Sequence, residues 1–386
     1  MKELTYSIVF TGDVSFDKYM DGRWNDKDLL SDEIYDFLYD SNNVIVNLEG
    51  ALYQPLNTEG SSAYFHAMNP EAVSALRNMR ADIWSISNNH IMDAGKEGII
   101  STINNAKKVG CKTFGAGLNE DEASRPIIID NKAGGVGIIS VGYHNECVPA
   151  TANSAGCFCW DNMELISNRI AEIKNRCRWC IVVSHGGEEF SPVPLPYTRD
   201  RYIKYLKMGA DVVVGHHPHV VENYEMFEDG KIIFYSLGNF IFDTDYQRSH
   251  LYTDIGVLLK LNFTNEKIDF ESIGIKINRT ENKIVKYPLP DIFTNISSDD
   301  YELLAPLGAK AFIAEDMRKM IYLEPSKYND NSEALESYFS GCSHEDYVKG
   351  SHMDFNKIIP LAEEYEKLQW QDSKLEKVKN YILTLL

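Results

Sequence analysis

Long apolar runs are missing from this chain of 386 residues. No segment approaches the roughly 18 consecutive apolar residues that a membrane-spanning helix needs. The N-terminal stretch MKELTYSIVFTGDV holds one apolar run of strand length, too short for the hydrophobic region of a secretory signal. We therefore expect no membrane span and a cytoplasmic protein. If a signal or anchor has been trimmed, the expectation is an extracellular or membrane-associated protein instead.

Basic residues are scarce as well. The sequence has 38 lysines and arginines against 57 aspartates and glutamates, a formal net charge of -19. A surface of this sign repels nucleic acid and anionic membranes. Because no basic cluster interrupts it, we predict that nucleic acid is not a partner. An anionic ligand would need local positive charge from a metal ion, from histidine or arginine, or from a helix N-terminus.

The seven cysteines do not indicate a disulfide framework. They are odd in number and scattered, and no secretory signal accompanies them. Cys177 and Cys180 form a C-x-x-C at the entrance to an expected strand, without a second pair that would complete a zinc site. We interpret the cysteines as reduced thiols, with a zinc or redox role for this pair as the alternative.

Up to about residue 245 the sequence alternates short β-branched runs with amphipathic helical patterns, which is typical of an α/β domain. Over residues 252–280 apolar and polar residues alternate with a period of two, which predicts a terminal β hairpin on the same sheet system. From residue 298 the patterns are mostly helical. We therefore predict a main domain over residues 1–297 and a helical accessory region over 298–386.

Polar side chains follow many of the expected strands. They are Asp13 in TGDVS, Asn47 and Glu49 in VNLEG, Asn88, Asn89 and His90 in SISNNH, His185 in VVSHGG, and His216, His217 and His219 in VGHHPH. The carboxyl ends of parallel strands meet at one edge of an open sheet, where ligands bind, so we expect one site there. Taken alone, Asp13 is typical of a helix cap and SNNH of a turn.

The mixture of carboxylate, amide and imidazole donors suits Mn, Zn or Fe better than Ca or a metal that seeks thiolates. His217 and His219 are two residues apart, and in a strand such residues point to the same face. Both rings would then reach one metal ion or lie on either side of a substrate. Pro218 between them restricts the backbone.

Seven motifs in order now point to a family. The motifs GDV, NLEG, SNNHIMDAG, GAG, HGGEEF, GHHPHV and YSLGNFIFD resemble those of the CapA family of capsule and poly-γ-glutamate synthesis proteins. That family is a divergent branch of the calcineurin-like metallophosphoesterases. The resemblance covers about residues 5–245. It implies a four-layer α/β sandwich, with two mixed sheets packed face to face and helices outside, and here a C-terminal helical extension.

The resemblance also implies roles at single positions. Asp13 is the first metal ligand, Glu49 takes the place of a bridging aspartate, and His90 hydrogen-bonds the reacting group. The implied metal ligands are Asp13, Glu49, Asn89, His185, His217 and His219, the implied catalytic residues are His90, Asp13 and His217, and the closing turn is Gly238 and Asn239. We add as predicted substrate-binding residues Asn47, Asn88, His216, Glu188 and Arg199.

Two departures from the phosphoesterase pattern stand out. The first strand should end in Asp-x-His, and here it reads Asp13-Val14-Ser15, which is expected to weaken at least one of two metal positions. The usual Trp of the H-W-G motif is Gly186, which opens space beside His185. For Arg199, which follows a proline-rich loop, an anion clamp and a solvated helix start are both open.

Three functions are compatible with these residues. The first is a metal-dependent hydrolase or transferase acting on a phosphoester or on a γ-glutamyl or peptide-like amide, linked to capsule or poly-γ-glutamate metabolism. The second is a metal-free acid/base enzyme such as a peptide epimerase, with Asp13 or Glu49 paired to a histidine of GHHPH. The third is a non-catalytic partner of membrane-bound machinery that makes an anionic polymer.

Overall fold

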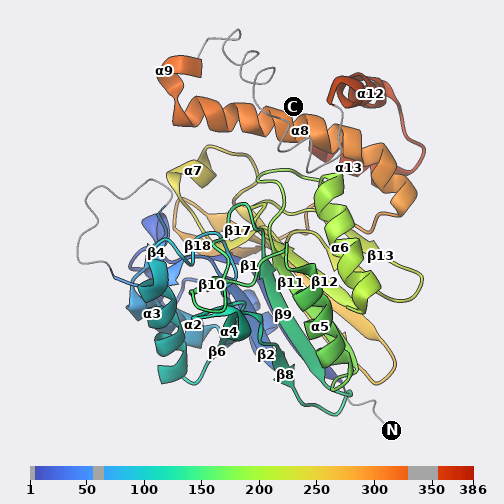
Figure 1. Ribbon diagram of the computed structural model, residues 1–386. Helices are drawn as coiled ribbons and strands as arrows, with labels where there is room; N and C mark the ends of the chain where they lie inside the picture. The colour runs from blue at the N-terminus through green and yellow to red at the C-terminus, as the bar shows by residue number, and fades with distance from the viewer. Residues whose placement is uncertain (1–4, 55–64, 329–354) are drawn as a thin grey trace.

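Two mixed β-sheets form the centre of the fold in the computed structural model, which describes residues 5–54, 65–328 and 355–386 (Figure 1). The first sheet has the strand order β18, β17, β16, β1, β2, β5, β6, and β15 pairs with the end of β1. Its strands are β1 (Tyr6–Val14), β2 (Asn43–Leu48), β5 (Ala81–Ser85), β6 (Lys112–Phe114), β15 (Asn239–Ile241), β16 (Ile255–Phe263), β17 (Ile268–Asn278) and β18 (Lys283–Tyr287). β16 and β17 pair antiparallel over the segment where a hairpin is predicted.

The second sheet has the strand order β13, β14, β12, β11, β9, β8. Its strands are β8 (Ile127–Ile129), β9 (Val136–Gly142), β11 (Trp179–His185), β12 (Val212–His216), β13 (Tyr224–Met226) and β14 (Ile232–Phe234). The four central strands are parallel, and antiparallel strands close both edges. Two short ladders lie apart: β3 (Ala51–Leu52) with β4 (Ala67–Met68), and β7 (Ala116–Gly117) with β10 (Gly156–Cys157).

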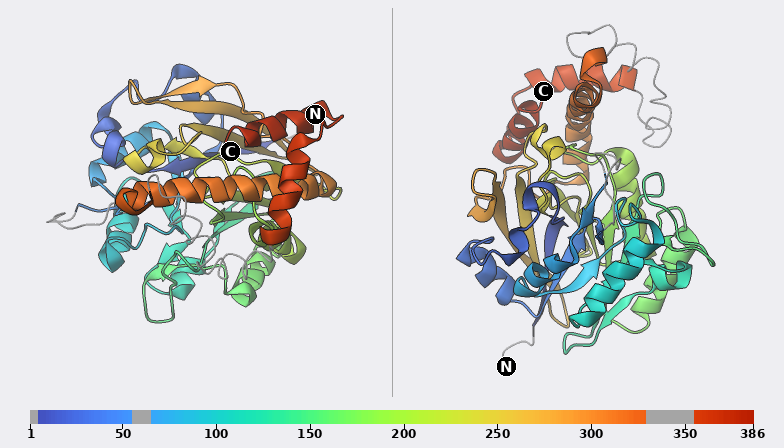
Figure 2. Two further views of the ribbon diagram at one scale, coloured as in Figure 1. Left: turned by 90° about the horizontal axis from the view of Figure 1, so that it is seen from above. Right: turned by 90° about the vertical axis from the view of Figure 1, so that its left-hand side faces the viewer.

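Helices cover the outer faces of both sheets. The helices before residue 250 are α1 (Asp32–Tyr39), α2 (Val73–Asn78), α3 (Gly95–Lys108), α4 (Glu120–Ser124), α5 (Met163–Lys174), α6 (Pro196–Met208) and α7 (Asp245–Arg248), with 3-10 turns at Lys18–Met20, Arg23–Asn25 and Pro70–Ala72. The right-hand view of Figure 2 shows α3 and its neighbours against one side of the strands.

Alternation along the strands builds the layers, because successive side chains of a strand point to opposite faces. In β1, Ile8 and Phe10 belong to the cluster between the sheets, whereas Val9 packs toward the helices outside the first sheet. In β11, Val183 faces the same inner cluster and Val182 faces α5 and α6. The four-layer sandwich implied by the resemblance is therefore confirmed.

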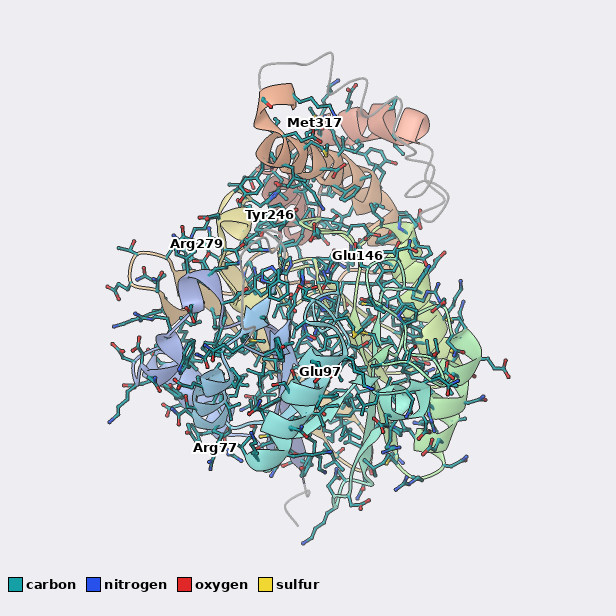
Figure 3. The ribbon with its side chains drawn as sticks, turned by 60° about the vertical axis from the view of Figure 1, so that its left-hand side comes forward. Arg77, Glu97, Glu146, Tyr246, Arg279 and Met317 are labelled. Carbon is teal, nitrogen blue, oxygen red and sulfur yellow. The ribbon has the colours of Figure 1, made fainter. Side chains whose placement is uncertain are left out.

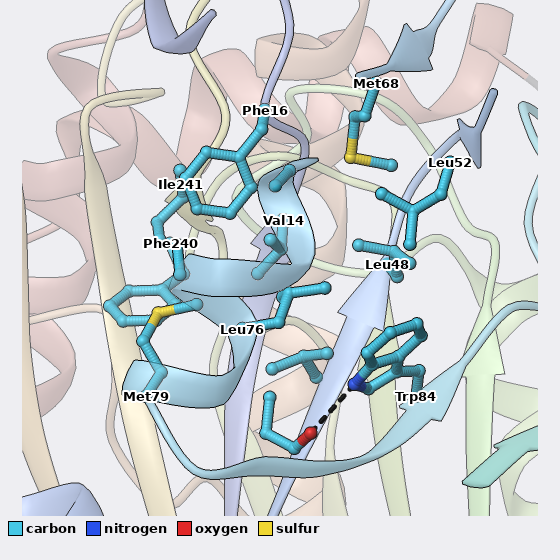
Figure 4. Packing of buried hydrophobic residues seen from close by; sticks show 14 of the residues in the cluster. Val14, Phe16, Leu48, Leu52, Met68, Leu76, Met79, Trp84, Phe240 and Ile241 are labelled. Carbon is cyan, nitrogen blue, oxygen red and sulfur yellow. Dashed lines mark hydrogen bonds between the residues drawn. The ribbon is translucent and has the colours of Figure 1, made fainter. Parts of the chain in front are cut away.

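The outer core of the first sheet is dry and close-packed (Figure 4). Leu48 and Trp84 on the strands pack with Leu76 and Met79 of the α2 region, and all four are at most 1% exposed. The one polar atom of Trp84 is satisfied, since its indole N–H donates to the Ala81 carbonyl oxygen at 2.8 Å. This layer fixes the strands whose carboxyl ends carry the predicted site.

The C-terminal region lies across the end of the sandwich opposite the N-terminus (Figures 1 and 2). It contains α8 (Ser298–Leu323), α9 (Pro325–Tyr328), α12 (Phe355–Lys367) and α13 (Ser373–Leu383). A capping box of Ser297 and Asp300 starts α8. Phe312 then packs on Leu195 of the core. The domain boundary at residue 297 stays a prediction. None of the helices that the structure describes has the length and apolarity to cross a bilayer.

Candidate metal centre

The carboxyl ends of β1, β2, β11 and β12 converge at one end of the sandwich. Asp13 lies at the end of β1, Glu49 directly follows β2, and His185 ends β11. The turn before β15 crosses β1 closely, and the Asp13 N–H donates to the Gly238 oxygen at 3.0 Å. Gly12 permits this approach, because a Cβ there would lie 2.1 Å from the same oxygen.

Glu49 is the centre of the cluster. Its side chain is fully buried, and neither carboxylate oxygen has a hydrogen-bond partner. The Oε1 atom lies 3.9 Å from His90 Nε2, 3.8 Å from His185 Nε2 and 3.7 Å from His219 Nε2. These distances are too long for hydrogen bonds. A buried carboxylate surrounded by imidazole nitrogens that it does not contact leaves room for a cation among them.

One side of the cluster is formed by Asp13 and His219. Asn47 donates its Nδ2 hydrogen to Asp13 Oδ1 at 2.8 Å, and the His217 backbone N–H donates to Oδ2 at 3.3 Å. His219 Nδ1 lies 2.9 Å from Asn239 Oδ1 and 3.4 Å from Asp13 Oδ2. With Nδ1 donating to Asn239, the lone pair of Nε2 points toward Glu49, which is the form of histidine that binds a metal.

The other side is formed by His185 and His217. His185 Nδ1 lies 3.0 Å from Asn47 Nδ2, and its Nε2 lies 2.9 Å from Asn89 Oδ1. His217 Nε2 lies 2.9 Å from Glu146 Oε2 without hydrogen-bond alignment. The Glu146 side chain is 32% exposed, so this side of the cluster is nearer to solvent. Figure 3 shows Glu146 and Tyr246 on the side of the sandwich that α8 covers.

His217 and His219 lie in the loop after β12, which ends at His216. Their φ angles are 98° and 59°, in the left-handed region that side-chain-bearing residues rarely adopt. The prediction that both rings share one strand face is wrong for this reason, and the ring centroids are 6.0 Å apart. Strained backbone of this kind clusters at functional sites. The loop aims each ring at a different side of Glu49.

Two sets of ligand atoms result, and both include Glu49. Asp13, Glu49 and His219 form one set, and Glu49, His185 and His217 form the other, with the atoms of each set within 4.8 Å of one another. All these side chains are buried. Carboxylate and imidazole donors fit Mn, Zn or Fe. The unpartnered carboxylate of Glu49 and this donor set thus fit a divalent metal ion, and the bridging role of Glu49 stays a prediction.

Burial and mutual charge shape the pKa values here. Burial raises the pKa of Glu49 well above its usual range, against the lowering effect of His219. Burial also favours the neutral carboxyl of Asp13, but the His216 and His219 imidazoles, whose Nδ1 atoms lie 3.2 and 3.4 Å from its oxygens, hold its pKa well below the usual range. Burial, with the nearby charge of His217, lowers the pKa of His185 well below its ordinary value. A neutral imidazole at His185 and an ionised carboxylate at Asp13 are the charge states that metal binding requires. As placed here, His185 Nδ1 accepts from Asn47 and Nε2 donates to Asn89, so a metal at Nε2 would replace the Asn89 contact.

His90 is held at the edge of the cluster by a carboxylate that the sequence prediction did not include. His90 Nδ1 lies 2.8 Å from Asp93 Oδ2. The same oxygen accepts the backbone N–H of His66 at 2.8 Å. Burial lowers the pKa of His90 despite the opposing effect of Asp93. The pair fixes the ring so that Nε2 faces Glu49.

Not every predicted substrate-binding residue joins the cluster. Asn47 and His216 do, since His216 Nδ1 lies 3.2 Å from Asp13 Oδ1. Asn88 instead braces the backbone: its Nδ2 donates to the Leu48 oxygen at 2.8 Å, and its Oδ1 accepts the Gly50 N–H at 3.3 Å. Asn88 therefore positions the turn that carries Glu49 rather than facing a ligand.

Glu188 and Arg199 are used for packing near α6. Glu188 accepts hydrogen bonds from the Leu195 N–H at 3.0 Å and the Thr198 hydroxyl at 2.9 Å. Arg199 is buried and makes a two-pronged contact with Glu225, at 2.6 and 2.9 Å. Neither an anion clamp nor a solvated helix start describes Arg199, because the side chain is buried and paired with Glu225. The local sequence gives no sign of this partner on β13.

Helix α8 brings further charged groups toward the cluster. Lys319 Nζ lies 2.7 Å from Glu189 Oε2, and burial of Glu189 is outweighed by the Lys319 charge, which lowers the pKa of Glu189. His250 pairs with Glu315 at 2.7 Å, and the His250 ring stacks on Phe190 at 3.7 Å. Glu189 and Phe190, the last two residues of HGGEEF, therefore connect the cluster to the C-terminal region.

Comparison with known sequences decides the family. A sequence profile described as bacterial capsule synthesis protein PGA_cap matches residues 7–244. The chain belongs to the PGA_cap family. The PGA biosynthesis protein CapA of Bacillus subtilis (strain 168) is 30% identical over 288 residues, which are 72% of this chain and 74% of that protein. The capsule biosynthesis protein CapA of Bacillus anthracis is 31% identical over 186 residues, 46% of this chain and 44% of that protein.

The solved structures that resemble this PGA_cap protein share little sequence with it. A novel phosphatase from Mycoplasma pneumoniae has a TM-score of 0.43 and 13% identity, covering 71% of this chain and 94% of that one. A 5'-nucleotidase precursor from Thermus thermophilus has a TM-score of 0.42 and 12% identity, covering 81% of this chain and 59% of that one. The PGA_cap profile ends at residue 244, so α8 and the other C-terminal helices lie outside it.

Proposed function

We propose that this PGA_cap protein is a metal-dependent hydrolase or transferase that acts on a γ-glutamyl amide of an anionic polymer, with a phosphoester as the alternative substrate. The observation that carries the proposal is the buried, unpartnered carboxylate of Glu49 among three imidazole nitrogens at 3.7 to 3.9 Å. The choice of a γ-glutamyl amide is supported by the relative from Bacillus subtilis, which is named for PGA biosynthesis.

Each ligand set has a defined place in the proposal. Asp13, Glu49 and His219 would hold one metal ion, and Glu49, His185 and His217 would hold a second, with Asn89 beside His185. A divalent cation bound there would act as a Lewis acid toward a carbonyl or phosphoryl oxygen. With Ser15 in place of the expected histidine, the Asp13 set has one imidazole fewer than the phosphoesterase pattern.

His90 is the proposed general acid. Asp93 accepts the Nδ1 hydrogen, so Nε2 is directed toward the cluster, where it can take up a proton and pass it to the leaving group. The ring is largely buried, with 13% of its side chain exposed, and this restricts water at the reacting atoms. Glu146, which is partly exposed beside His217, marks the side from which substrate enters.

Family membership also supports a proposal for the partners of the protein and for where it works. We propose that it works beside the machinery that makes an anionic polymer, since two relatives from Bacillus are named for PGA and capsule biosynthesis. Its substrate is peptide-like and anionic, and the metal centre supplies positive charge that the surface, with a net charge of -19, lacks.

The test combines metal content with turnover. Protein purified without chelator and without a histidine tag is analysed by inductively coupled plasma mass spectrometry. It is then incubated with γ-linked glutamate oligomers or with p-nitrophenyl phosphate. We expect one or two equivalents of Mn, Zn or Fe and cleavage of the oligomers. The metal of the Asp13 set and the cleavage should be lost in Asp13→Asn. Full metal content and cleavage should be kept in the matched control Asp269→Asn, an exposed residue of β17 that pairs with Lys267.

The other outcomes separate the alternatives. Full turnover by metal-stripped protein would overturn metal dependence. Incorporation of deuterium from heavy water into a bound peptide, without cleavage, would replace the proposal with the metal-free epimerase. Polyglutamate binding that survives Asp13→Asn, with no turnover of either substrate by metal-loaded protein, would favour a non-catalytic partner.

A further inference from the structure

His66 lies beside the cluster although no motif of the sequence pointed to it. It immediately precedes β4, which pairs with β3, the strand that follows Glu49 and Gly50. The Ala51 N–H donates to the His66 oxygen at 3.4 Å. Gly50 has a φ of 106°, and a Cβ at this position would lie 2.8 Å from the same oxygen. The backbone of His66 is therefore fixed against the turn that carries Glu49.

The ring of His66 is held on two sides. Its Nδ1 lies 2.5 Å from Asp17 Oδ2, and each of these two side chains is 7% exposed. The ring meets the His90 ring edge to face, with the centroids 4.3 Å apart. Phe242 packs on it at 5.2 Å. His66 is thus an oriented ring between a buried carboxylate and the ring of the proposed general acid.

The His66–Asp17 pair and the His90–Asp93 pair therefore lie next to each other, and one oxygen of Asp93 contacts both histidines. Asp93 Oδ2 is 2.8 Å from His90 Nδ1 and accepts the His66 backbone N–H at 2.8 Å. Burying the Asp17 pair is costly, and well-packed apolar side chains of similar volume serve a purely structural role equally well. The Oδ1 atom of Asp17 is also buried without a partner, which adds to the cost.

We infer that His66 is a positioning residue for His90, and that Asp17 fixes the rotation of the His66 ring. In this arrangement the His66 edge keeps the His90 imidazole in the plane in which Nδ1 meets Asp93 and Nε2 faces Glu49. His66 does not itself touch the substrate. The inference rests on the proposed function for the catalytic role of His90, but not for the orientation of its ring.

Two substitutions of His66 separate its ring contact with His90 from its contact with Asp17. His66→Phe keeps an aromatic edge beside His90 and loses the pair with Asp17. His66→Asn removes the ring. We expect His66→Asn to lower kcat on the γ-glutamyl substrate about tenfold or more with KM unchanged, because small misplacements of a catalytic group are expensive. His66→Phe should lower kcat clearly less than His66→Asn does. Asp17→Asn should have about the same kcat as His66→Phe.

A readout without turnover decides the inference. In protein labelled with nitrogen-15 at histidine, long-range proton–nitrogen spectra report which ring nitrogen of His90 carries the proton. We expect one tautomer, with the proton on Nδ1, in wild type and in His66→Phe, and an average of two tautomers in His66→Asn. Unchanged His90 signals in a folded His66→Asn protein would overturn the inference. If wild type shows no turnover, the proposed function fails, but this comparison still decides the role of His66.

Discussion

Two buried glutamates of this protein have the same burial and different surroundings. Glu49 is 0% and Glu222 is 1% exposed, and neither has a hydrogen-bond partner for its carboxylate oxygens. Burial raises the pKa of both well above the usual range. Around Glu49, however, imidazole nitrogens approach from three different segments, namely the loop after β5, the end of β11 and the loop after β12. Glu222 forms no ion pair with any of the described residues, and the charge that acts on it is that of Glu188, which also raises its pKa.

The difference teaches that burial alone does not mark a site. A buried, unpartnered carboxylate becomes a candidate metal ligand when other donors converge on the same space. Without such donors, burial favours the neutral, protonated form of the carboxyl. The two positions are therefore natural controls for each other, as are the amides Asn239, bonded to His219, and Asn223, whose side-chain atoms are buried without partners.

The largest contrast should come from Glu49→Gln against Glu222→Gln. Glu49 belongs to both ligand sets, so its replacement should reduce bound metal to a small fraction of an equivalent and kcat by about 100-fold or more. Glu222→Gln should leave metal content and kcat close to wild type. Metal analysis and turnover on the same preparations test this. Equal metal content in the two variants would contradict the two-set arrangement.

His90→Asn should act on the chemistry and not on metal binding. The loss of a general acid commonly costs about 10² to 10⁴ in rate. We expect kcat to fall within this range while metal content stays at the wild-type value, since His90 belongs to neither ligand set. Asp93→Asn should give a smaller fall, because the ring remains. Loss of metal in His90→Asn would show that it is a ligand instead.

Asn239→Ala should weaken metal binding in a graded way. Asn239 Oδ1 accepts the His219 Nδ1 hydrogen, and removing such a partner typically lowers metal affinity by about 10- to 100-fold. Competition with a calibrated chelator measures the affinity. Asn223→Ala is the matched control and should leave the affinity unchanged. A similar loss in both variants would mean that the effect is one of stability.

The smallest effect concerns the pH dependence of stability at Glu222. Its pKa is raised on folding, so the folded state binds the proton more tightly than the unfolded chain. Its contribution to stability is fully present below the unfolded pKa and is lost as the pH rises toward the folded pKa. Glu222→Gln cannot ionise. The free energy of its unfolding in urea, relative to wild type, should therefore increase from about pH 5 to about pH 8. A constant difference would place the folded pKa near its ordinary value.

Local patterns predict an α/β domain and the polar residues at its strand ends, whereas the four layers were implied only by the resemblance to the CapA family. Apolar strands that end in polar residues bring Asp13, Glu49 and His185 to one end of the sandwich. The expectation of a single sheet edge was wrong, because β1 and β2 belong to the first sheet and β11 to the second. The geometry of the loops cannot be predicted from these patterns. The left-handed backbone at His217 and His219 separates two rings that a strand would have put on one face.

Contacts between segments that are distant in the sequence also cannot be predicted from local patterns. Glu146, which meets His217, and Asp17, which meets His66, come from loops whose paths depend on the whole fold. Asp93 could have been found, because it follows His90 by three residues in a predicted turn. Arg199 could not be assigned, since nothing near it in the sequence indicates Glu225 as its partner.

The backbone of the loop after β12 has a consequence for how such a protein changes over time. Holding His217 and His219 at φ angles of 98° and 59° costs of the order of 1 to 3 kcal/mol each. Glycine adopts such φ angles without that cost, but at either position it would also remove a buried imidazole from the cluster. Under the proposed function, the two histidines accept backbone strain in order to present their rings to Glu49, and selection for that function is what would keep glycine out of these positions.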